Sequence, residues 1–79
     1  MENVKEAVHR VVQSVFSSVG NELYEEWGPN DIEDWDSMGH LNLVMALGEE
    51  FNITLEFEEV MAIQKIEDIF LILEGKGIA

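Results

Sequence analysis

Few side chains in this 79-residue sequence could do chemistry, and the clearest candidates stand close together at Asp36, Ser37 and His40. The chain has no cysteine, so thiolate nucleophiles, disulfides and zinc–thiolate sites are excluded. Ser37 stands where a polar stretch gives way to a regular apolar pattern, so Asp36 or Ser37 can cap a helix that begins there. Unpaired backbone N–H groups and the helix dipole would favour a phosphate on Ser37. An ordinary helix cap uses the same residue types, so this position alone establishes no site.

Two other chemistries would use the neighbouring residues. Ser37 and His40 would share a helix face, but a hydrolase also needs an orienting acid and an oxyanion hole, and the chain offers no strand–turn–helix framework for them. A calcium loop with its glycine at Gly39 would place Met45 where an acidic ligand is required. We therefore predict neither catalytic residues nor a metal site. His40 is expected to be a partly exposed surface residue, and His9 to lie on the polar face of a helix.

The elements that must position Ser37 begin with an amphipathic helix near the start of the chain. Asn3 is a plausible N-cap and Glu6 stands at the capping-box position. This helix should end near residues 17–20. Its apolar face follows the i, i+3, i+4, i+7 spacing: Val4, Ala7, Val8, Val11, Val12, Val15 and Phe16.

A long connection, about residues 19–36, separates this helix from Ser37. Loops of this length are uncommon in compact domains and are usually functional or firmly held. One helical turn is predicted near residues 22–27, followed by a Gly28-Pro29 turn. We expect an ordered loop whose large side chains cover one end of a helical bundle: Leu23, Tyr24, Trp27, Ile32 and Trp35.

Three more helices are predicted after the connection, over residues 37–51, 56–61 and 65–74, and the last should end at Gly75. The run Ile69 to Leu73 has the composition of a strand, but no partner strand is apparent. The sequence therefore predicts an all-α fold. It would be a small four-helix bundle of three main helices and one short one, with a long first loop, forming one domain over residues 1–79.

The helix predicted to begin at Ser37 has two apolar stripes. The first stripe, which suits a core, consists of Leu43, Val44, Leu47 and Phe51. The second is rotated toward another face and consists of Met38, Leu41 and Met45. A helix with two apolar faces is either deeply buried or presents a surface to a partner.

The charge of the chain limits its partners. Lys and Arg total 4 and Asp and Glu total 17, for a net charge of −13 at pH 7, and no Lys or Arg occurs between Arg10 and Lys65. Nucleic acid and anionic membrane surfaces would be repelled, whereas a basic patch on a protein would be attracted. No apolar leader follows Met1, and no apolar run is long enough to span a bilayer. We expect a cytoplasmic monomer that neither binds nucleic acid nor inserts into membranes.

The string Asp36-Ser37-Met38, with the apolar pattern that follows it, resembles the Asp-Ser-Leu attachment region of acyl carrier proteins. The match extends through the predicted second helix to Ile69, and chain length, acidity and helix order also agree. The resemblance implies that Ser37 accepts 4′-phosphopantetheine from coenzyme A through a separate phosphopantetheinyl transferase (holo-carrier synthase). Asp36 would help to position the metal and coenzyme A during that transfer. The chain itself would be a carrier and not an enzyme.

The resemblance also implies roles for two further groups of residues. Met38, Leu41, Met45 and Glu49 would contact partners, namely acyl-transferring or condensing enzymes with basic surface patches. A pocket for the acyl chain, which is carried as a thioester, would be lined by Leu43, Leu47, Phe51, Leu55, Val60, Ile63, Ile66 and Ile69.

Several positions depart from the familiar fatty-acid carriers. Gly39 stands where they have an acid, Asn42 and Gly48 stand where they usually have Glu, and Trp35 replaces a small residue. The Trp-Asp-Ser-Met-Gly-His string looks more like stand-alone carriers of specialised pathways. The resemblance as a whole implies a carrier for fatty-acid, polyketide or related specialised biosynthesis. Two alternatives remain open: a D-alanyl, aminoacyl or peptidyl-type carrier, and an acidic helical interaction protein without a prosthetic arm.

Overall fold

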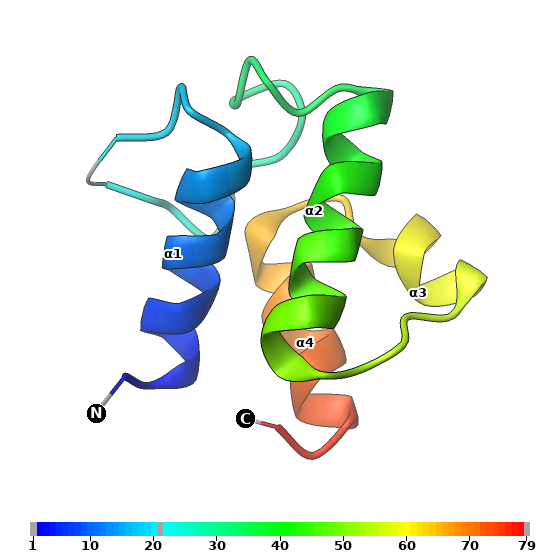
Figure 1. The fold of residues 1–79 in the computed structure, drawn as a ribbon. Helices are drawn as coiled ribbons and strands as arrows, with labels where there is room; N and C mark the ends of the chain where they lie inside the picture. Colours follow the sequence, from blue (N-terminus) through cyan, green and yellow to red (C-terminus); the bar gives the residue numbers. More distant parts are fainter. Residues whose placement is uncertain (1, 21, 79) are drawn as a thin grey trace.

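The computed structural model describes residues 2–20 and 22–78 and contains four helices, in the order α1 (Val4–Val15), α2 (Ser37–Phe51), α3 (Phe57–Ala62) and α4 (Ile66–Gly75). α1, α2 and α4 lie side by side, and the short α3 lies on the side of α2 and α4 that faces away from α1 (Figure 1). No strand occurs within the described ranges. The predicted all-helical fold of three main helices and one short helix is confirmed, and α2 has the predicted bounds.

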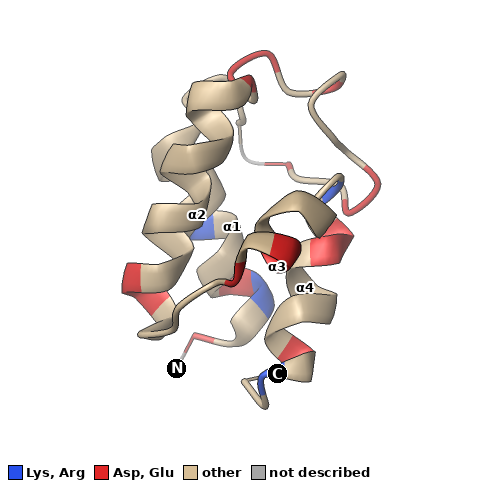
Figure 2. Ribbon diagram, turned by 90° about the vertical axis from the view of Figure 1, so that its right-hand side faces the viewer, with Lys and Arg blue, Asp and Glu red and all other residues tan. Residues whose placement is uncertain are grey.

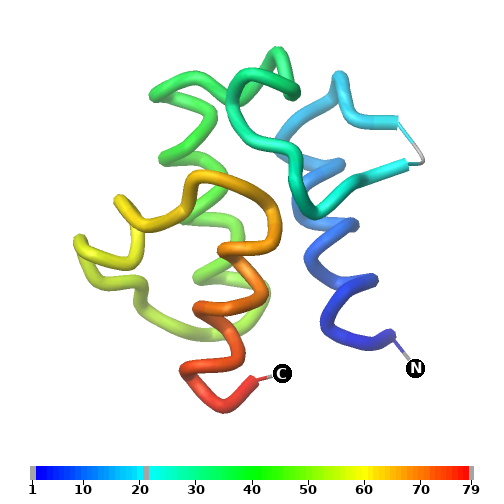
Figure 3. Tube along the Cα trace, turned by 180° about the vertical axis from the view of Figure 1, so that it is seen from behind, coloured from blue at the N-terminus to red at the C-terminus, as the bar shows by residue number. Residues whose placement is uncertain are grey.

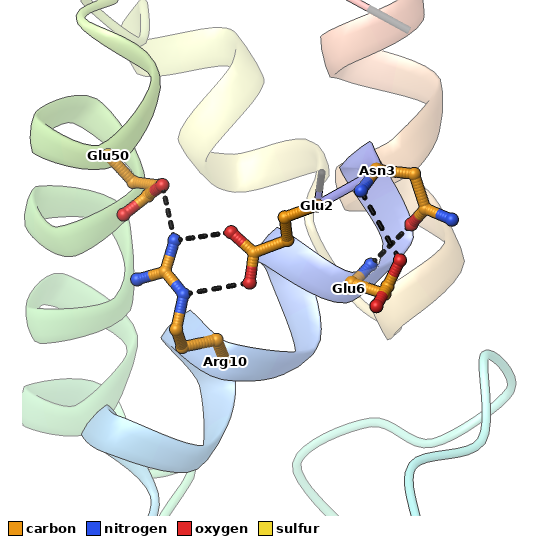
Figure 4. Close-up of polar contacts among 5 residues, drawn as sticks. All are labelled: Glu2, Asn3, Glu6, Arg10 and Glu50. Atoms are coloured by element: carbon orange, nitrogen blue, oxygen red, sulfur yellow. Dashed lines mark hydrogen bonds and ion pairs between the residues drawn. The ribbon is translucent and has the colours of Figure 1, made fainter.

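The start of α1 is the capping box that the sequence predicts. Asn3 Oδ1 accepts a hydrogen bond from the Glu6 N–H at 2.8 Å, and Glu6 Oε1 accepts one from the Asn3 N–H at 3.3 Å (Figure 4). These two bonds satisfy donors that a helix start otherwise leaves unpaired. His9, predicted on the polar face, is half-buried, and its Nε2 is buried with no hydrogen-bond partner in the described part of the chain.

The end of α1 was predicted too late. The helix stops at Val15, not at residues 17–20, because Phe16 adopts an extended backbone conformation. This turns the Phe16 side chain fully into the core, where it stacks on Trp35 with ring centroids 5.6 Å apart. Burial of a large aromatic side chain outweighs one more turn of helix.

The core lies between the three main helices and is closed at one end by the long connection. Its buried members are all apolar, and no polar or charged residue among those described is buried. They are Ala7, Val8, Val11, Val12, Phe16, Val19, Ile32, Trp35, Leu43, Leu47, Ile63, Ile66, Ile69 and Leu73.

The long connection is held against the start of α4 by backbone hydrogen bonds. Figure 3 shows the connection passing beside the start of α4. The Ile66 N–H donates to the Trp27 carbonyl and the Glu67 N–H to the Glu25 carbonyl, each at 2.9 Å. A Cβ atom at Gly28 would lie 2.4 Å from the Gln64 carbonyl oxygen, so only glycine allows this approach.

The predicted helical turn at residues 22–27 is wrong. In its place the chain makes a single non-helical turn, closed by a hydrogen bond from the Trp27 N–H to the Tyr24 carbonyl. Asn21, in the same predicted connection, lies outside the described residues. Among the predicted anchors, Ile32 and Trp35 are buried, and Leu23 and Trp27 pack half-buried against the core. Tyr24 is exposed and packs edge-on against Trp27, so it does not cover the bundle end as predicted.

Arg10 connects α1 to α2 on the surface. Its Nε and Nη2 donate to the two carboxylate oxygens of Glu2 at 3.0 and 2.9 Å, and Nη2 also donates to Glu50 of α2 at 2.5 Å (Figure 4). The hydrogen bonds from Arg10 hold the pKa of Glu2 below its usual range. Because the groups are largely exposed, this cluster orients the two helices more than it stabilises them.

Candidate functional site

Ser37 is the first residue of α2, and its side chain is exposed. Asp36 is the N-cap: its Oδ1 accepts a hydrogen bond from the Gly39 N–H at 2.7 Å. Of the two caps that the sequence allows, the structure therefore selects Asp36. The Ser37 hydroxyl is left on the surface, beside the positive end of the helix dipole.

The junction between the connection and α2 is fixed by Asp34. Its Oδ2 accepts a hydrogen bond from the Ser18 N–H at 2.9 Å, which ties the junction to the segment after α1. Its carbonyl oxygen lies so close to α2 that a Cβ atom on Gly39 would be 2.2 Å away, and the same Cβ would be 3.0 Å from the Phe16 ring. Gly39 is thus the residue that lets the loop pack directly beneath Ser37.

His40 forms a bridge that the sequence did not reveal. Its Nδ1 accepts a hydrogen bond from Trp35 Nε1 at 2.9 Å, and its Nε2 lies 2.8 Å from the Val60 carbonyl oxygen of α3. Since Nδ1 is an acceptor, Nε2 carries the proton and donates to Val60, so His40 is a neutral imidazole in this arrangement. The His40 and Trp35 rings also stack, 6.1 Å apart. The half-buried His40 therefore joins the loop, α2 and α3.

A groove of about 770 Å³ opens beside Ser37. Its lining comes from the long connection, from α2, from α3 and from Ile63, which follows α3. No sequence pattern indicated it, because it exists only once α3 is placed beside α2. Its lining consists of Pro29, Trp35, Asp36, Ser37, His40, Leu41, Phe57, Val60, Met61 and Ile63.

The second apolar stripe of α2 is on the surface. Met38, Leu41 and Met45 are all exposed, and no charged residue occurs in α2 before Glu49. Figure 2 shows α2 without acidic or basic colour except at its C-terminal end. Glu49, predicted to contact partners, is exposed at the C-terminal end of this helix.

The residues predicted to form an acyl pocket are brought together but are closely packed. Leu43, Leu47, Ile63, Ile66 and Ile69 are buried in the core. Phe51, Leu55 and Val60 are half-buried. Of this set, only Val60 and Ile63 also line the groove.

Two further properties of the chain bear on its chemistry. In residues 2–20 and 22–78, no three His, Asp or Glu side chains gather in a way that could hold a metal ion. None of the helices in the same ranges has the length and apolar character needed to cross a membrane.

Comparison with known proteins shows a relationship in structure. No model of a known protein family matches the sequence, and no curated protein matches it. A solved structure from Mycobacterium tuberculosis, described as "a putative acyl carrier protein", superimposes with a TM-score of 0.80. The match covers 91% of this chain and 96% of that one, at 19% sequence identity. The chain therefore has an acyl-carrier-protein-like fold.

Proposed function

We propose that this chain is a carrier protein whose Ser37 receives a 4′-phosphopantetheine arm. The observation that supports this most directly is the exposed hydroxyl of Ser37 at the first residue of α2, in a fold shared with a protein described as an acyl carrier. The position suits a phosphodiester because the start of the helix offers a positive dipole end. Asp36, and not Ser37, supplies the cap, so the Ser37 hydroxyl is free to react.

The attachment is a phosphoryl transfer from coenzyme A to the Ser37 hydroxyl. The Ser37 oxygen bonds to the phosphorus nearest the pantetheine part of coenzyme A, and the bond from that phosphorus to 3′,5′-ADP breaks. The proton of the hydroxyl leaves to a base of the transferase. When bound, the arm supplies the thiol that carries an acyl group as a thioester. Asp36 would help to position the metal and coenzyme A in the transferase complex, with the carboxylate oxygen that does not cap the helix.

The proposal extends to the partner enzymes of the carrier and to the compartment in which it acts. Met38, Leu41 and Met45 form the exposed face on which the transferase and acyl-transferring or condensing enzymes would dock, and Glu49 would meet basic residues at its end. The buried cluster around Leu43 would shelter an acyl chain once it opens. The carrier would act as a cytoplasmic, non-catalytic monomer in fatty-acid, polyketide or related specialised biosynthesis.

Mass spectrometry tests the attachment. The purified protein is incubated with coenzyme A, Mg²⁺ and a broad-specificity phosphopantetheinyl transferase, and the intact mass should rise by one phosphopantetheine group. Ser37→Ala should show no gain, whereas Ser18→Ala, which removes another exposed hydroxyl, should load like the wild type. A wild-type protein that gains no mass would favour an acidic interaction protein without an arm.

A further inference from the structure

The methionines of the described residues all lie on the surface. Met38, Met45 and Met61 are 68%, 64% and 60% exposed, and the buried core contains no methionine. Met1 lies outside the described residues. Methionine is an apolar side chain that often fills gaps in protein cores, so its use only on the surface is informative. A chemical change at these sulfur atoms would leave the packing of the core intact.

Two of these methionines belong to the exposed apolar face of α2. Met38 is the residue after Ser37, and Met45 lies further along the same helix face, with the exposed Leu41 between them. No charged residue occurs in α2 before Glu49. The two thioethers therefore make up much of the uncharged surface beside the hydroxyl of Ser37.

The chemistry open to a solvent-exposed thioether is oxidation. The chain has no cysteine, so its only sulfur atoms before an arm is attached are those of methionine. A sulfur lone pair attacks the outer oxygen of a hydroperoxide, the O–O bond breaks, and the departing oxygen takes up the proton to leave as water or an alcohol. The sulfur loses two electrons and the peroxide gains them. The product, methionine sulfoxide, is polar, and sulfoxide reductases return it to the thioether at the expense of thiols.

We propose that Met38 and Met45 form a reversible modification site, at which oxidation to the sulfoxide by a hydroperoxide slows the loading of Ser37. The inference rests on the proposed attachment at Ser37 and on docking of the transferase at this face of α2. A thioether enters an apolar interface at little cost, whereas a sulfoxide oxygen would lose its water without gaining a donor. Oxidation thus opposes docking while the Ser37 hydroxyl itself stays unchanged.

Met61 provides a reference within the same molecule. It is about as exposed as Met45, but it belongs to α3 and not to the exposed face of α2. A hydroperoxide should therefore oxidise Met61 as readily as the two methionines of α2. The effect on loading should nevertheless follow Met38 and Met45 alone, which distinguishes the proposed site from oxidation of the surface in general.

Loading after oxidation measures the effect directly. The protein without its arm is treated with hydrogen peroxide, the peroxide is removed with catalase, and peptide mass spectrometry locates each added oxygen. Coenzyme A, Mg²⁺ and a broad-specificity phosphopantetheinyl transferase are then added, and intact mass follows the loading of Ser37. We expect the oxidised protein to load about tenfold more slowly than the untreated protein. Treatment with both sulfoxide reductases, one for each epimer, should restore the rate.

Leucine variants assign the effect to particular residues, because leucine keeps an apolar side chain of similar volume that peroxide does not oxidise. Each variant is compared with its own untreated form. The double variant Met38→Leu, Met45→Leu should load equally fast before and after peroxide, although Met61 still gains an oxygen. Met61→Leu is the matched control and should slow after peroxide as the wild type does.

Urea unfolding separates modification of the surface from damage to the fold. Because the core contains no methionine, the oxidised and untreated proteins should have the same unfolding midpoint. A midpoint that falls on oxidation would show that slower loading comes from loss of structure, and would overturn the proposed site.

The remaining outcomes distinguish this site from the carrier function. Oxygen located on Met38 and Met45 with an unchanged loading rate would overturn the modification site and leave the attachment at Ser37 intact. Slower loading that persists in the double variant and disappears in Met61→Leu would overturn the assignment to α2. An untreated protein that gains no phosphopantetheine would overturn the attachment at Ser37, and the control of its loading with it.

Discussion

Gly39 is the residue on which the placement of Ser37 depends most. The familiar carriers have an acid at this position, but here a Cβ atom would lie 2.2 Å from the Asp34 carbonyl oxygen, which is backbone and cannot rotate away. In a helix, alanine is otherwise favoured over glycine by about 1 kcal/mol. The clash with the Asp34 carbonyl therefore decides whether Gly39→Ala stabilises or destabilises the fold. We expect a loss of about 1–3 kcal/mol in the free energy of unfolding, measured in urea.

A glycine elsewhere in the molecule supplies the control for this change. Gly75 ends α4 and has no atom within 4 Å of an added Cβ. Gly75→Ala should be neutral or slightly stabilising. If Gly39→Ala behaves in the same way, the loop does not pack beneath Ser37 as described.

The hydrogen bond between Trp35 and His40 leads to a second prediction, which concerns the stability lost when either partner is replaced. His40→Leu removes the acceptor and leaves the Trp35 N–H, which is buried, without a partner. An unsatisfied buried donor costs about 1–3 kcal/mol. Trp35→Phe removes the donor, so the double variant should lose less stability than the sum of the single variants.

Urea unfolding of the four proteins in this double-mutant cycle measures the coupling. Trp27 remains as the fluorescent reporter when Trp35 is replaced. Strictly additive losses would mean that the two rings do not share a hydrogen bond.

Among the elements, α3 depends most on its neighbours. With six residues it is too short to be stable alone. Glu59 Oε1 accepts a hydrogen bond from the Glu56 N–H at 2.8 Å and forms an ion pair with Lys76 Nζ at 2.9 Å. Lys76 Nζ also donates a hydrogen bond to the Thr54 carbonyl. Lys76 therefore ties the end of α4 to the start of α3.

These contacts predict how α3 responds to acid. The backbone hydrogen bond from Glu56, followed by Lys76, lowers the pKa of Glu59. A carboxyl group whose pKa is lower in the folded state contributes stability above its unfolded pKa, and this contribution is lost as the pH falls through the folded pKa. The Glu56 amide signal should thus titrate at a pH below the ordinary carboxyl range, with α3 loosening as it does so.

Two lysine variants separate the causes of that shift. Lys76→Met should raise the midpoint of the Glu56 amide titration toward the ordinary range, because it removes the ion pair and leaves the backbone hydrogen bond. Lys65→Met should not change it, since Lys65 pairs with Glu67 instead. An unchanged midpoint in Lys76→Met would show that the ion pair is absent in solution.

The helices were largely predictable because apolar periodicity is a local property of the sequence. The start of α1 and both ends of α2 agree with prediction, and the bounds of α3 and α4 differ by one residue. The end of α1 was missed because Phe16 leaves the helix to stack on Trp35, which is distant in the sequence. The same reason hid the His40 bridge and the groove, since both need α3 beside α2. The placement of Asp36 and Ser37 at the start of α2 was predictable, because a helix start has a local signal in the sequence.

At the scale of the whole molecule, acidic residues far outnumber basic ones. Each of the four basic residues forms an ion pair with a glutamate, and most of the 17 acids have no such partner in the described part of the chain. The surplus carboxylates repel one another in the compact state. We expect salt or Mg²⁺ to raise the midpoint of urea unfolding by screening this repulsion.

Urea curves at low and high ionic strength test this expectation. Sodium chloride provides screening alone, and a comparison with Mg²⁺ at equal ionic strength would reveal any contribution from ion binding. A midpoint that stays constant, or falls as the surface ion pairs weaken, would show that repulsion does not limit the stability of the fold.

The uncharged outer face of α2 has a consequence for the kinetics of any partner complex. The carboxylates at the two ends of this face, Asp36 and Glu49, act over distance and govern how quickly two molecules meet. The methionine and leucine side chains act only once water has left the interface. Added salt should then slow association while leaving the lifetime of the bound state nearly constant. The rate of association and the rate of release would then be set independently, the first by Asp36 and Glu49 and the second by Met38 and Met45.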